Sequence, residues 1–160
     1  MSEFRPVEGS FDAGDARFAI VVARWNGEIT EGLLRGALRA LVRHGVPEKA
    51  VTVVRVPGAF ELPSAAKKIT ETGKFSAVIC LGCVIRGGTP HFEYVCGECA
   101  RGIGEVALQT GLPVAFGVLT TEDLQQALDR SGDNEENKGE EAALTVLEMV
   151  NLYCQIPELI

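Results

Sequence analysis

The sequence predicts an α/β protein, a three-layer sandwich in which helices cover both faces of a flavodoxin-like, four-stranded parallel sheet. Four short and almost wholly apolar segments alternate with longer segments whose apolar residues recur at helical spacing. Strands of a parallel sheet are buried on both faces, so they read as continuous apolar runs joined by helical crossovers. Right-handed crossovers then favour the flavodoxin-like topology. We expect one domain, residues 1–160.

The first third of the chain is expected to contain an arm, a strand and a helix. Residues 1–15 are polar and form the arm, in which residues 5–8 are a candidate edge strand. The apolar run at residues 17–23 predicts the first strand of the sheet. Thr30 is expected to cap the helix that follows, and Gly45 to end it.

The remaining elements continue the same alternation. Residues 130–137 are polar and acidic, and we expect a loop there. The other expected strands are residues 51–56, 76–85 and 113–119, and the other expected helices are residues 62–69, residues 91–110, a short segment from residue 121, and residues 138–152.

Composition limits the partners that this protein is expected to have. Acidic residues outnumber basic ones by 22 to 15, so the net charge is −7 and a general nucleic-acid surface is not expected. The longest nearly continuous apolar run is about ten residues, which is too short for a bilayer span. The first residues lack the apolar stretch of a secretory signal. We therefore expect a cytoplasmic protein with no nucleic-acid and no membrane partner.

The five cysteines suggest a reducing compartment, because an odd number cannot all pair in a disulfide framework. Cys80 and Cys83, like Cys96 and Cys99, have the spacing of zinc ligands. Residues three apart on a strand point to opposite faces, however, and Cys96 and Cys99 fall on the apolar stripe of the next helix. We expect no metal site. A knuckle between Cys80 and Cys83 would be needed for the zinc alternative.

The turn after the third predicted strand carries the most specific chemistry. Gly87 and Gly88 permit a tight turn and the close approach of a ligand. Thr89 is expected to cap the next helix and Pro90 to be its first residue, so that free N–H groups and the helix dipole meet an anion such as phosphate. His91 can then exchange protons with the molecule that carries the phosphate. The alternative is a tight connection without a function.

Other candidates follow the ends of strands, where ligands bind in open α/β sheets. Trp25 either packs beside its strand or stacks on a planar ligand. Glu61, with Phe60 next to it, either contacts a ligand or is a carboxylate favoured by a helix N-terminus. Phe116 lies within a strand and is expected in the core. Taken alone, the pattern assigns three charged residues to a solvated cluster of ion pairs: Arg130, Lys138 and Glu141.

Five separated motifs, taken together, are more specific than any one of these residues. They are RWN at residues 24–26, VPGAFELP at 56–63, Gly82 with VIRGGTPHF at 84–92, FGVLT at 116–120, and NKG at 137–139 with EAA at 141–143. In this order they resemble lumazine synthases, enzymes of riboflavin biosynthesis. The resemblance extends from about residue 7 to residue 152.

The resemblance implies an enzyme without metal or organic cofactor. It would condense 5-amino-6-(D-ribitylamino)uracil with 3,4-dihydroxy-2-butanone 4-phosphate to give 6,7-dimethyl-8-ribityllumazine, phosphate and water. His91 corresponds to the proton donor, Gly88 and Thr89 to phosphate binders, and Arg130 to a phosphate clamp from a neighbouring subunit. The residues implied at the pyrimidine and its ribityl chain are Trp25, Asn26, Ala59, Phe60, Glu61, Cys83, Val84 and Ile85, with Phe116 contributed by the neighbour and Lys138 and Glu141 close by.

Two features depart mildly from the family pattern, and the resemblance also implies assembly. Cys83 stands where a plain aliphatic residue is expected, and residues 133–136 are unusually acidic for a phosphate site. Family members form pentamers, decamers or sixty-subunit shells that can enclose riboflavin synthase, and their N-terminal segment pairs with a neighbour's sheet. The short 130–137 turn favours the shell. Alternatives to an active synthase are a relative that binds flavin or lumazine without catalysis, and a cage-forming protein.

Overall fold

A parallel sheet lies at the centre of the molecule, which is described here by a computed structural model covering residues 4–159. Residues 1–3 of the predicted arm lie outside the described residues, as does residue 160. The strands follow the order β2-β1-β3-β4, and every neighbouring pair is parallel. This order confirms the predicted flavodoxin-like class. The strands are β1 (Phe18–Ala23), β2 (Val51–Val56), β3 (Ala77–Ile85) and β4 (Val114–Thr121).

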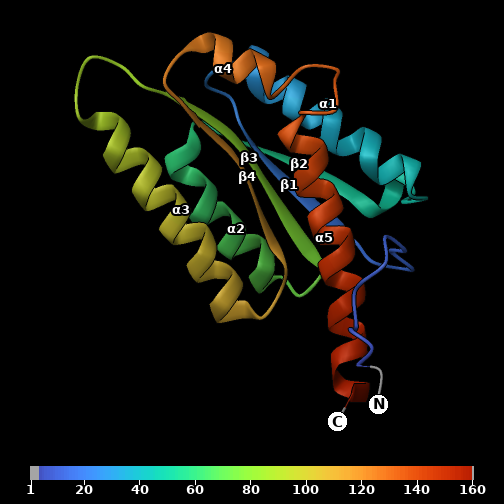
Figure 1. The fold of residues 1–160 in the computed structure, drawn as a ribbon. Coiled ribbons are helices and arrows are strands. Elements are labelled where there is room, and N and C mark those ends of the chain that lie inside the picture. Colours follow the sequence, from blue (N-terminus) through green and yellow to red (C-terminus); the bar gives the residue numbers. More distant parts are fainter. Residues whose placement is uncertain (1–3, 160) are drawn as a thin grey trace.

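Helices cover both faces of the sheet and make the three layers visible in Figure 1. No helix within residues 4–159 combines the length and the apolar character that a membrane span requires. On one face lie α2 (Leu62–Glu71) and α3 (His91–Thr110), and on the other lie α1 (Gly27–Arg43), α4 (Leu124–Asp129) and α5 (Lys138–Gln155). Short 3₁₀ turns are η1 (Glu48–Ala50), η2 (Ala59–Glu61) and η3 (Ile156–Leu159).

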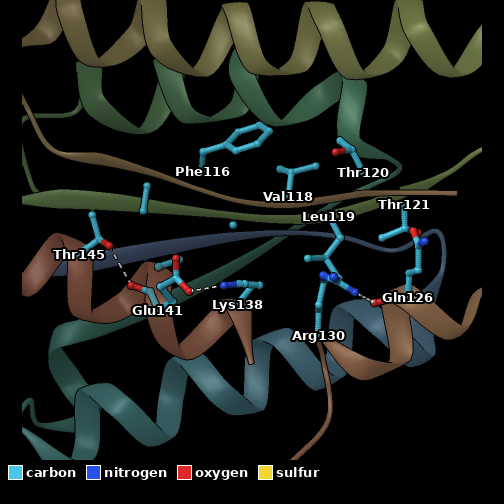
Figure 2. A pocket seen from close by; sticks show the side chains of 13 residues that line it. Phe116, Val118, Leu119, Thr120, Thr121, Gln126, Arg130, Lys138, Glu141 and Thr145 are labelled. Atoms are coloured by element: carbon cyan, nitrogen blue, oxygen red, sulfur yellow. Dashed lines mark hydrogen bonds and ion pairs between the residues drawn. The ribbon is translucent and has the colours of Figure 1, made fainter. Parts of the chain in front are cut away.

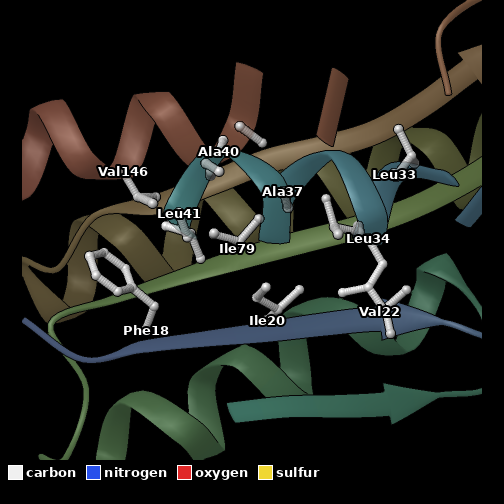
Figure 3. Close-up of a cluster of buried hydrophobic side chains, with 14 of the residues drawn as sticks. Phe18, Ile20, Val22, Leu33, Leu34, Ala37, Ala40, Leu41, Ile79 and Val146 are labelled. Carbon is white, nitrogen blue, oxygen red and sulfur yellow. The ribbon is translucent and has the colours of Figure 1, made fainter. Parts of the chain in front are cut away.

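Two apolar clusters, one on each face of the sheet, form the core. Phe18, Ile20 and Val22 of β1 point into the cluster with α1 and α5, as Figure 3 shows. Ala19 and Val21 point into the other cluster, with α2 and α3. All six residues of β1 are buried. The continuous apolar run of β1 therefore reflects burial on both faces, as expected for a central parallel strand.

The cysteines follow the same alternation of faces. Cys80 lies in the α2/α3 cluster with Cys99, whereas Cys83 lies in the α1/α5 cluster. Cys80 and Cys83 therefore cannot share a zinc ion, as their strand spacing predicted. Burial raises the pKa of Cys83 to about 11 and that of Cys99 to about 12, so both thiols are neutral near pH 7.

Two predicted helix caps differ from the structure, although α3 covers the predicted residues 91–110. α1 begins at Gly27, and Asn26 occupies the N-cap position with a left-handed φ of 58°, so Thr30 lies inside the helix instead of capping it. Asparagine tolerates this left-handed conformation, so the turn between β1 and α1 ends at Asn26. α3 begins at His91 after Pro90, not after Thr89, because the Pro90 carbonyl already accepts the Glu93 N–H at 3.1 Å. The shift is one residue.

The N-terminal arm contains no strand within its described residues, so the predicted edge strand at residues 5–8 is not formed in the single chain. Besides hydrogen bonds within itself, the arm forms hydrogen bonds with α5. The Ser10 N–H donates to Asn151 Oδ1 at 2.8 Å, and Gln155 Nε2 donates to the Glu8 carbonyl at 3.2 Å. The arm therefore lies along the C-terminal half of α5 (Figure 1). Its pairing with another chain stays a prediction.

A buried asparagine fastens the start of α5 to α1. Asn137 Oδ1 accepts the N–H groups of Gly139 at 2.9 Å and Glu140 at 3.0 Å. Its Nδ2 donates to carbonyl oxygens of α1 and of the preceding turn, at 3.1 and 2.8 Å. A Cβ on Gly139 would lie 1.9 Å from the Leu33 carbonyl oxygen, so the two helices meet backbone to backbone. This contact determines where Lys138 lies.

Candidate active site

A pocket of about 440 Å³ opens where β1 and β3 end and where η2 and α3 begin. This volume is typical of small-molecule sites. Four segments that are far apart in the sequence supply its walls, and all but two of the lining residues were predicted from the sequence. The lining residues are Trp25, Asn26, Ala59, Phe60, Glu61, Cys83, Val84, Ile85, His91, Tyr94 and Val95.

Trp25 forms one wall of the pocket, and 65% of it is exposed. Its ring lies against the backbone of Gly58, where an added Cβ would come within 2.3 Å of Trp25 Cε3. The φ of Gly58 is −144°, so close approach of the ring, not a left-handed backbone, requires glycine at this position. The exposed surface of the ring is available to stack on a planar ligand, which burial in the core would prevent.

Glu61 is held at the pocket wall by a turn that its own carboxylate closes. The Gly58 N–H donates to Glu61 Oε2 at 3.1 Å, and the Glu61 N–H donates to the Gly58 carbonyl at 3.3 Å, so the two residues close the η2 turn before α2. The predicted role at a helix N-terminus is therefore present. Within residues 4–159, Oε1 accepts no hydrogen bond, so this oxygen is left to meet donors on a ligand.

Asn26 and Cys83 join the ends of two neighbouring strands. Asn26 Nδ2 donates to the Cys83 carbonyl oxygen at 3.0 Å, which ties the end of β1 to β3. The Asn26 side chain therefore uses one of its N–H donors in a hydrogen bond within the protein. The sequence did not indicate this bond, because Asn26 was expected to contact the substrate. Cys83 is only 5% exposed, and with its neutral thiol it is equivalent to the small aliphatic residue expected there.

His91 is the first residue of α3 and lines the pocket directly after an exposed turn, residues 86–90. Neither Gly87 nor Gly88 has a positive φ, although a strained turn was one expected reason for glycine. An added Cβ would meet nothing within 4 Å on either residue. Nothing within the described chain therefore requires glycine here. The reason that remains is the approach of a ligand, or of another chain, to the backbone of Gly88 and Thr89.

Four further predicted site residues lie in a groove of about 510 Å³ along β4, the edge strand, and they are Phe116, Arg130, Lys138 and Glu141. Figure 2 shows Phe116 on the α2/α3 side of β4 and the charged residues on the α4/α5 side. Lys138 Nζ lies 2.5 Å from Glu141 Oε2, while Arg130 Nη1 donates to the Gln126 carbonyl at 2.9 Å. The expected ion-pair cluster thus forms between Lys138 and Glu141 and does not include Arg130.

Phe116 corrects the expectation from the sequence pattern that a strand residue belongs to the core. It is 47% exposed, whereas its neighbours Ala115 and Gly117 are buried. β4 pairs with β3 on one side, and its other side is the edge of the sheet within the described residues. Residues of an edge strand lack the cover that a further strand would supply. Phe116 is therefore an exposed aromatic residue at the rim of the groove.

The predicted site residues thus occupy the pocket and the groove, except Gly88 and Thr89, which lie in the exposed turn before His91 and line neither. The pocket also contains Tyr94 and Val95, which were not predicted as site residues. Their positions three and four residues after His91 place them on the same face of a helix, and this spacing was the available signal. The groove likewise contains Gln126, which only the approach of α4 to β4 reveals.

An open parallel sheet with a pocket at the carboxyl ends of its strands defines a small-molecule-binding α/β protein. The sequence model of one family, described as 6,7-dimethyl-8-ribityllumazine synthase, matches residues 15–153. The chain belongs to this family, and the resemblance seen in its motifs is confirmed. The family is one of enzymes that form lumazine in riboflavin biosynthesis.

Proposed function

We propose that this chain condenses 5-amino-6-(D-ribitylamino)uracil with 3,4-dihydroxy-2-butanone 4-phosphate to 6,7-dimethyl-8-ribityllumazine, with release of phosphate and water. One observation carries the proposal. A single pocket contains an exposed aromatic ring, a carboxylate oxygen without a protein donor and a histidine, supplied by Trp25, Glu61 and His91. The ring suits the pyrimidine, the carboxylate suits N–H and hydroxyl donors of the pyrimidine and ribityl chain, and the histidine suits proton transfer.

The reaction needs proton transfer and the stabilisation of a departing anion. The amine of the pyrimidine attacks the ketone to give a carbinolamine, and His91 protonates its hydroxyl so that it leaves as water. The resulting imine loses the proton of its adjacent carbon, and those electrons expel the phosphate, so that the C–O bond breaks with its electron pair on the phosphate. The ribityl-bearing amine then attacks the remaining carbonyl group, and loss of a second water closes the ring. N–H groups of Gly88 and Thr89, with the guanidinium of Arg130, stabilise that anion. These groups suffice without a metal ion or an organic cofactor.

The proposal requires a second copy of the chain. In the single chain, Arg130 lines the groove and His91 lines the pocket, which are two separate surfaces. Both surfaces are open, so the groove of one copy can complete the pocket of another. The acidic turn is partly neutralised for this role, because Asp133 forms an ion pair with Arg39 of α1. A homo-oligomer in the cytoplasm, built from pentamers, is the assembly that we propose.

Turnover and binding can be measured separately because Trp25 is the only tryptophan. Mixing both substrates with the protein should produce lumazine absorbance and free phosphate faster than the spontaneous reaction. Titration with the pyrimidine alone should quench Trp25 fluorescence. Quenching without any acceleration would reject the synthase and leave the second candidate.

The second candidate is a protein that binds flavin or lumazine without catalysis. The exposed ring of Trp25 favours it, because stacking on a planar heterocycle needs no reaction. On this alternative the wild type and the His91→Ala variant should bind lumazine equally well, and neither should accelerate its formation. A purely cage-forming protein would show neither quenching nor turnover.

A further inference from the structure

One arginine at the turn before His91 has no part in the chemistry proposed above. Arg86 follows the last residue of β3, and its N–H donates to the Thr121 carbonyl at 2.9 Å, which continues the pairing with β4. Its guanidinium forms ion pairs with Glu93, in the first turn of α3, and with Glu122, after β4. Nε lies 2.7 Å from Glu122 Oε2.

The same guanidinium also lies over an aromatic ring. Its central carbon is 4.3 Å from the centre of the Phe92 ring, the distance of a cation–π contact. Phe92 and Glu93 are the two residues that follow His91 in α3. Arg86, which directly precedes the turn, therefore contacts the first residues of α3, which directly follow it. Its ion pair with Glu122 joins this contact to the end of β4.

The turn itself has little else to hold it. Every residue from Arg86 to His91 is exposed, and added Cβ atoms on Gly87 and Gly88 would meet nothing within 4 Å. In Figure 1 this connection is the arch between the end of β3 and the start of α3. Because two adjacent glycines have large conformational freedom, such a turn needs contacts at its two ends to keep its N–H groups in one arrangement.

The guanidinium is not free to serve as an anion-binding group. It is shared between two carboxylates, and the pKa of Arg86 is raised because of the hydrogen bonds to Glu122 and Glu93. The pKa of Glu93 is correspondingly lowered, chiefly by its hydrogen bond from Arg86. A phosphate that bound Arg86 directly would have to displace at least one carboxylate, which is a charge-assisted partner of similar strength.

We propose that Arg86 is a positioning residue, which closes the Gly87–Pro90 turn by joining α3 and the end of β4 and so presents the Gly88 and Thr89 N–H groups to the phosphate of the substrate. The proposal rests on the proposed function for the identity of that ligand. An isolated surface ion pair has little effect, but this network joins three elements through one planar side chain.

The test measures the Michaelis constant (KM) for each substrate and the inhibition constant of inorganic phosphate. Arg86→Ala should raise the KM of the phosphate substrate and the phosphate inhibition constant roughly fivefold to tenfold, as expected for loss of a small network of ion pairs and a cation–π contact. The KM of the pyrimidine should not change. For Arg86→Lys, both constants should lie between those of the wild type and Arg86→Ala. An ammonium group keeps the charge but cannot bridge both carboxylates as the planar guanidinium does.

Removing the two carboxylate partners of Arg86 distinguishes a positioning role from direct binding of phosphate. The double variant Glu93→Gln with Glu122→Gln should weaken phosphate inhibition, in the same direction as Arg86→Ala, because the turn is released. If Arg86 bound phosphate directly, removing its two carboxylate partners would free the guanidinium, and phosphate would bind more tightly. That outcome would overturn the proposal.

Arg101→Ala is the matched control. Arg101 is also on α3 and also pairs with two carboxylates, Glu98 and Glu105, but these lie on its own helix. The Arg101→Ala variant should leave both Michaelis constants unchanged. If it raised the KM of the phosphate substrate as much as Arg86→Ala does, Arg86 would act only through general surface charge.

Hydrogen exchange makes the test independent of the reaction. Without any ligand, Arg86→Ala should speed exchange of the hydrogen-bonded amides at the two ends of the turn, those of Arg86 and Glu93, and leave the peptide of β1 unchanged. If the wild type shows no turnover, only the proposed function is rejected. Faster exchange in Arg86→Ala would then still support the positioning role. Unchanged exchange would reject the positioning role, even if the wild type is an active synthase.

Discussion

The pocket and the groove are built in different ways. The pocket lies where β1 and β3 end, and one chain supplies its walls from both central strands, from η2 and from α3. The groove lies along β4, an edge strand, and is bounded by α4 and α5 on one side only. Its aromatic residue, Phe116, is nearly half exposed. One chain therefore supplies the walls of the pocket, whereas the groove is an open edge surface suited to meet the pocket of another chain.

This difference shows which side chains of each surface are already fixed within the chain and which remain available to a ligand or another chain. In the pocket, Asn26, Cys83 and Glu61 are fixed by hydrogen bonds within the chain, so their geometry is set before a ligand arrives. In the groove, the Arg130 guanidinium donates, among the described residues, only to the Gln126 carbonyl oxygen of α4. Its guanidinium keeps most of its donors for an external anion. Experiments that separate the two surfaces test this view directly.

The largest expected effect is in the pocket. His91→Ala should lower kcat about 10²–10⁴-fold, the range for a general acid–base group, with little change in either Michaelis constant. Stopped-flow absorbance of the lumazine product measures it. His44→Ala is the control, since the other histidine of the chain lies at the C-terminus of α1, against the Phe11 ring. A kcat within twofold of wild type for His91→Ala would remove the histidine from the mechanism.

The next effect is in the groove. Arg130→Ala should raise the Michaelis constant for the phosphate substrate by roughly 10–100-fold, since it removes a charge-assisted contact to a phosphate, and should change that of the pyrimidine far less. Initial rates with one substrate varied at a time measure both constants. Equal increases for both substrates would place Arg130 outside the phosphate site.

Mixing these two impaired variants, assayed at a low concentration of the phosphate substrate, sharpens the comparison itself. If a pocket from one chain meets a groove from another, co-assembled His91→Ala and Arg130→Ala subunits should regain activity, in about one site in four for random mixing. Each variant refolded alone is the control. No recovery in verified mixed assemblies would show that His91 and Arg130 act from the same chain.

A smaller effect concerns the support of the groove. Asn137→Ala should lower the free energy of unfolding by about 2–4 kcal/mol, because it removes a helix cap and leaves buried backbone groups without partners. Asn134→Ala, in the same turn but exposed, should cost less than about 0.5 kcal/mol. Urea unfolding followed by circular dichroism measures both. Equal losses would mean that the buried hydrogen bonds of Asn137 do not anchor α5.

The smallest effect is expected at the thiol in the pocket wall. Because burial raises the pKa of Cys83 to about 11, the reactive thiolate is scarce at pH 8 and becomes abundant only as the pH approaches that value. Iodoacetamide at pH 8 should therefore label the exposed Cys154 and spare Cys83, without loss of turnover. Peptide mass spectrometry identifies the labelled residue. Rapid labelling of Cys83 would show that the pocket wall opens.

The aromatic, acidic and histidine residues of the pocket could be predicted from the sequence because they follow strand ends, whereas Cys83, Val84 and Ile85 lie within β3 and were assigned through the family resemblance. Trp25, Glu61 and His91 each come after an apolar run, and parallel strands bring such residues to one edge. Tyr94 was missed because it belongs to the body of a helix, where an aromatic residue reads as packing. The role of Arg86 was missed because its partners Glu93 and Glu122 lie on two other elements.

The sequence by itself determined the class of fold, the order of the elements and the motifs that identify the family. These depend on apolar periodicity and on short runs of residues, which are local properties of a chain. Only the tertiary structure decided that Phe116 is exposed, that Arg130 lies apart from His91, and that Asn26 holds two strands together. Such features depend on which strand is at the edge and on how closely elements pack, and contacts between distant residues set both.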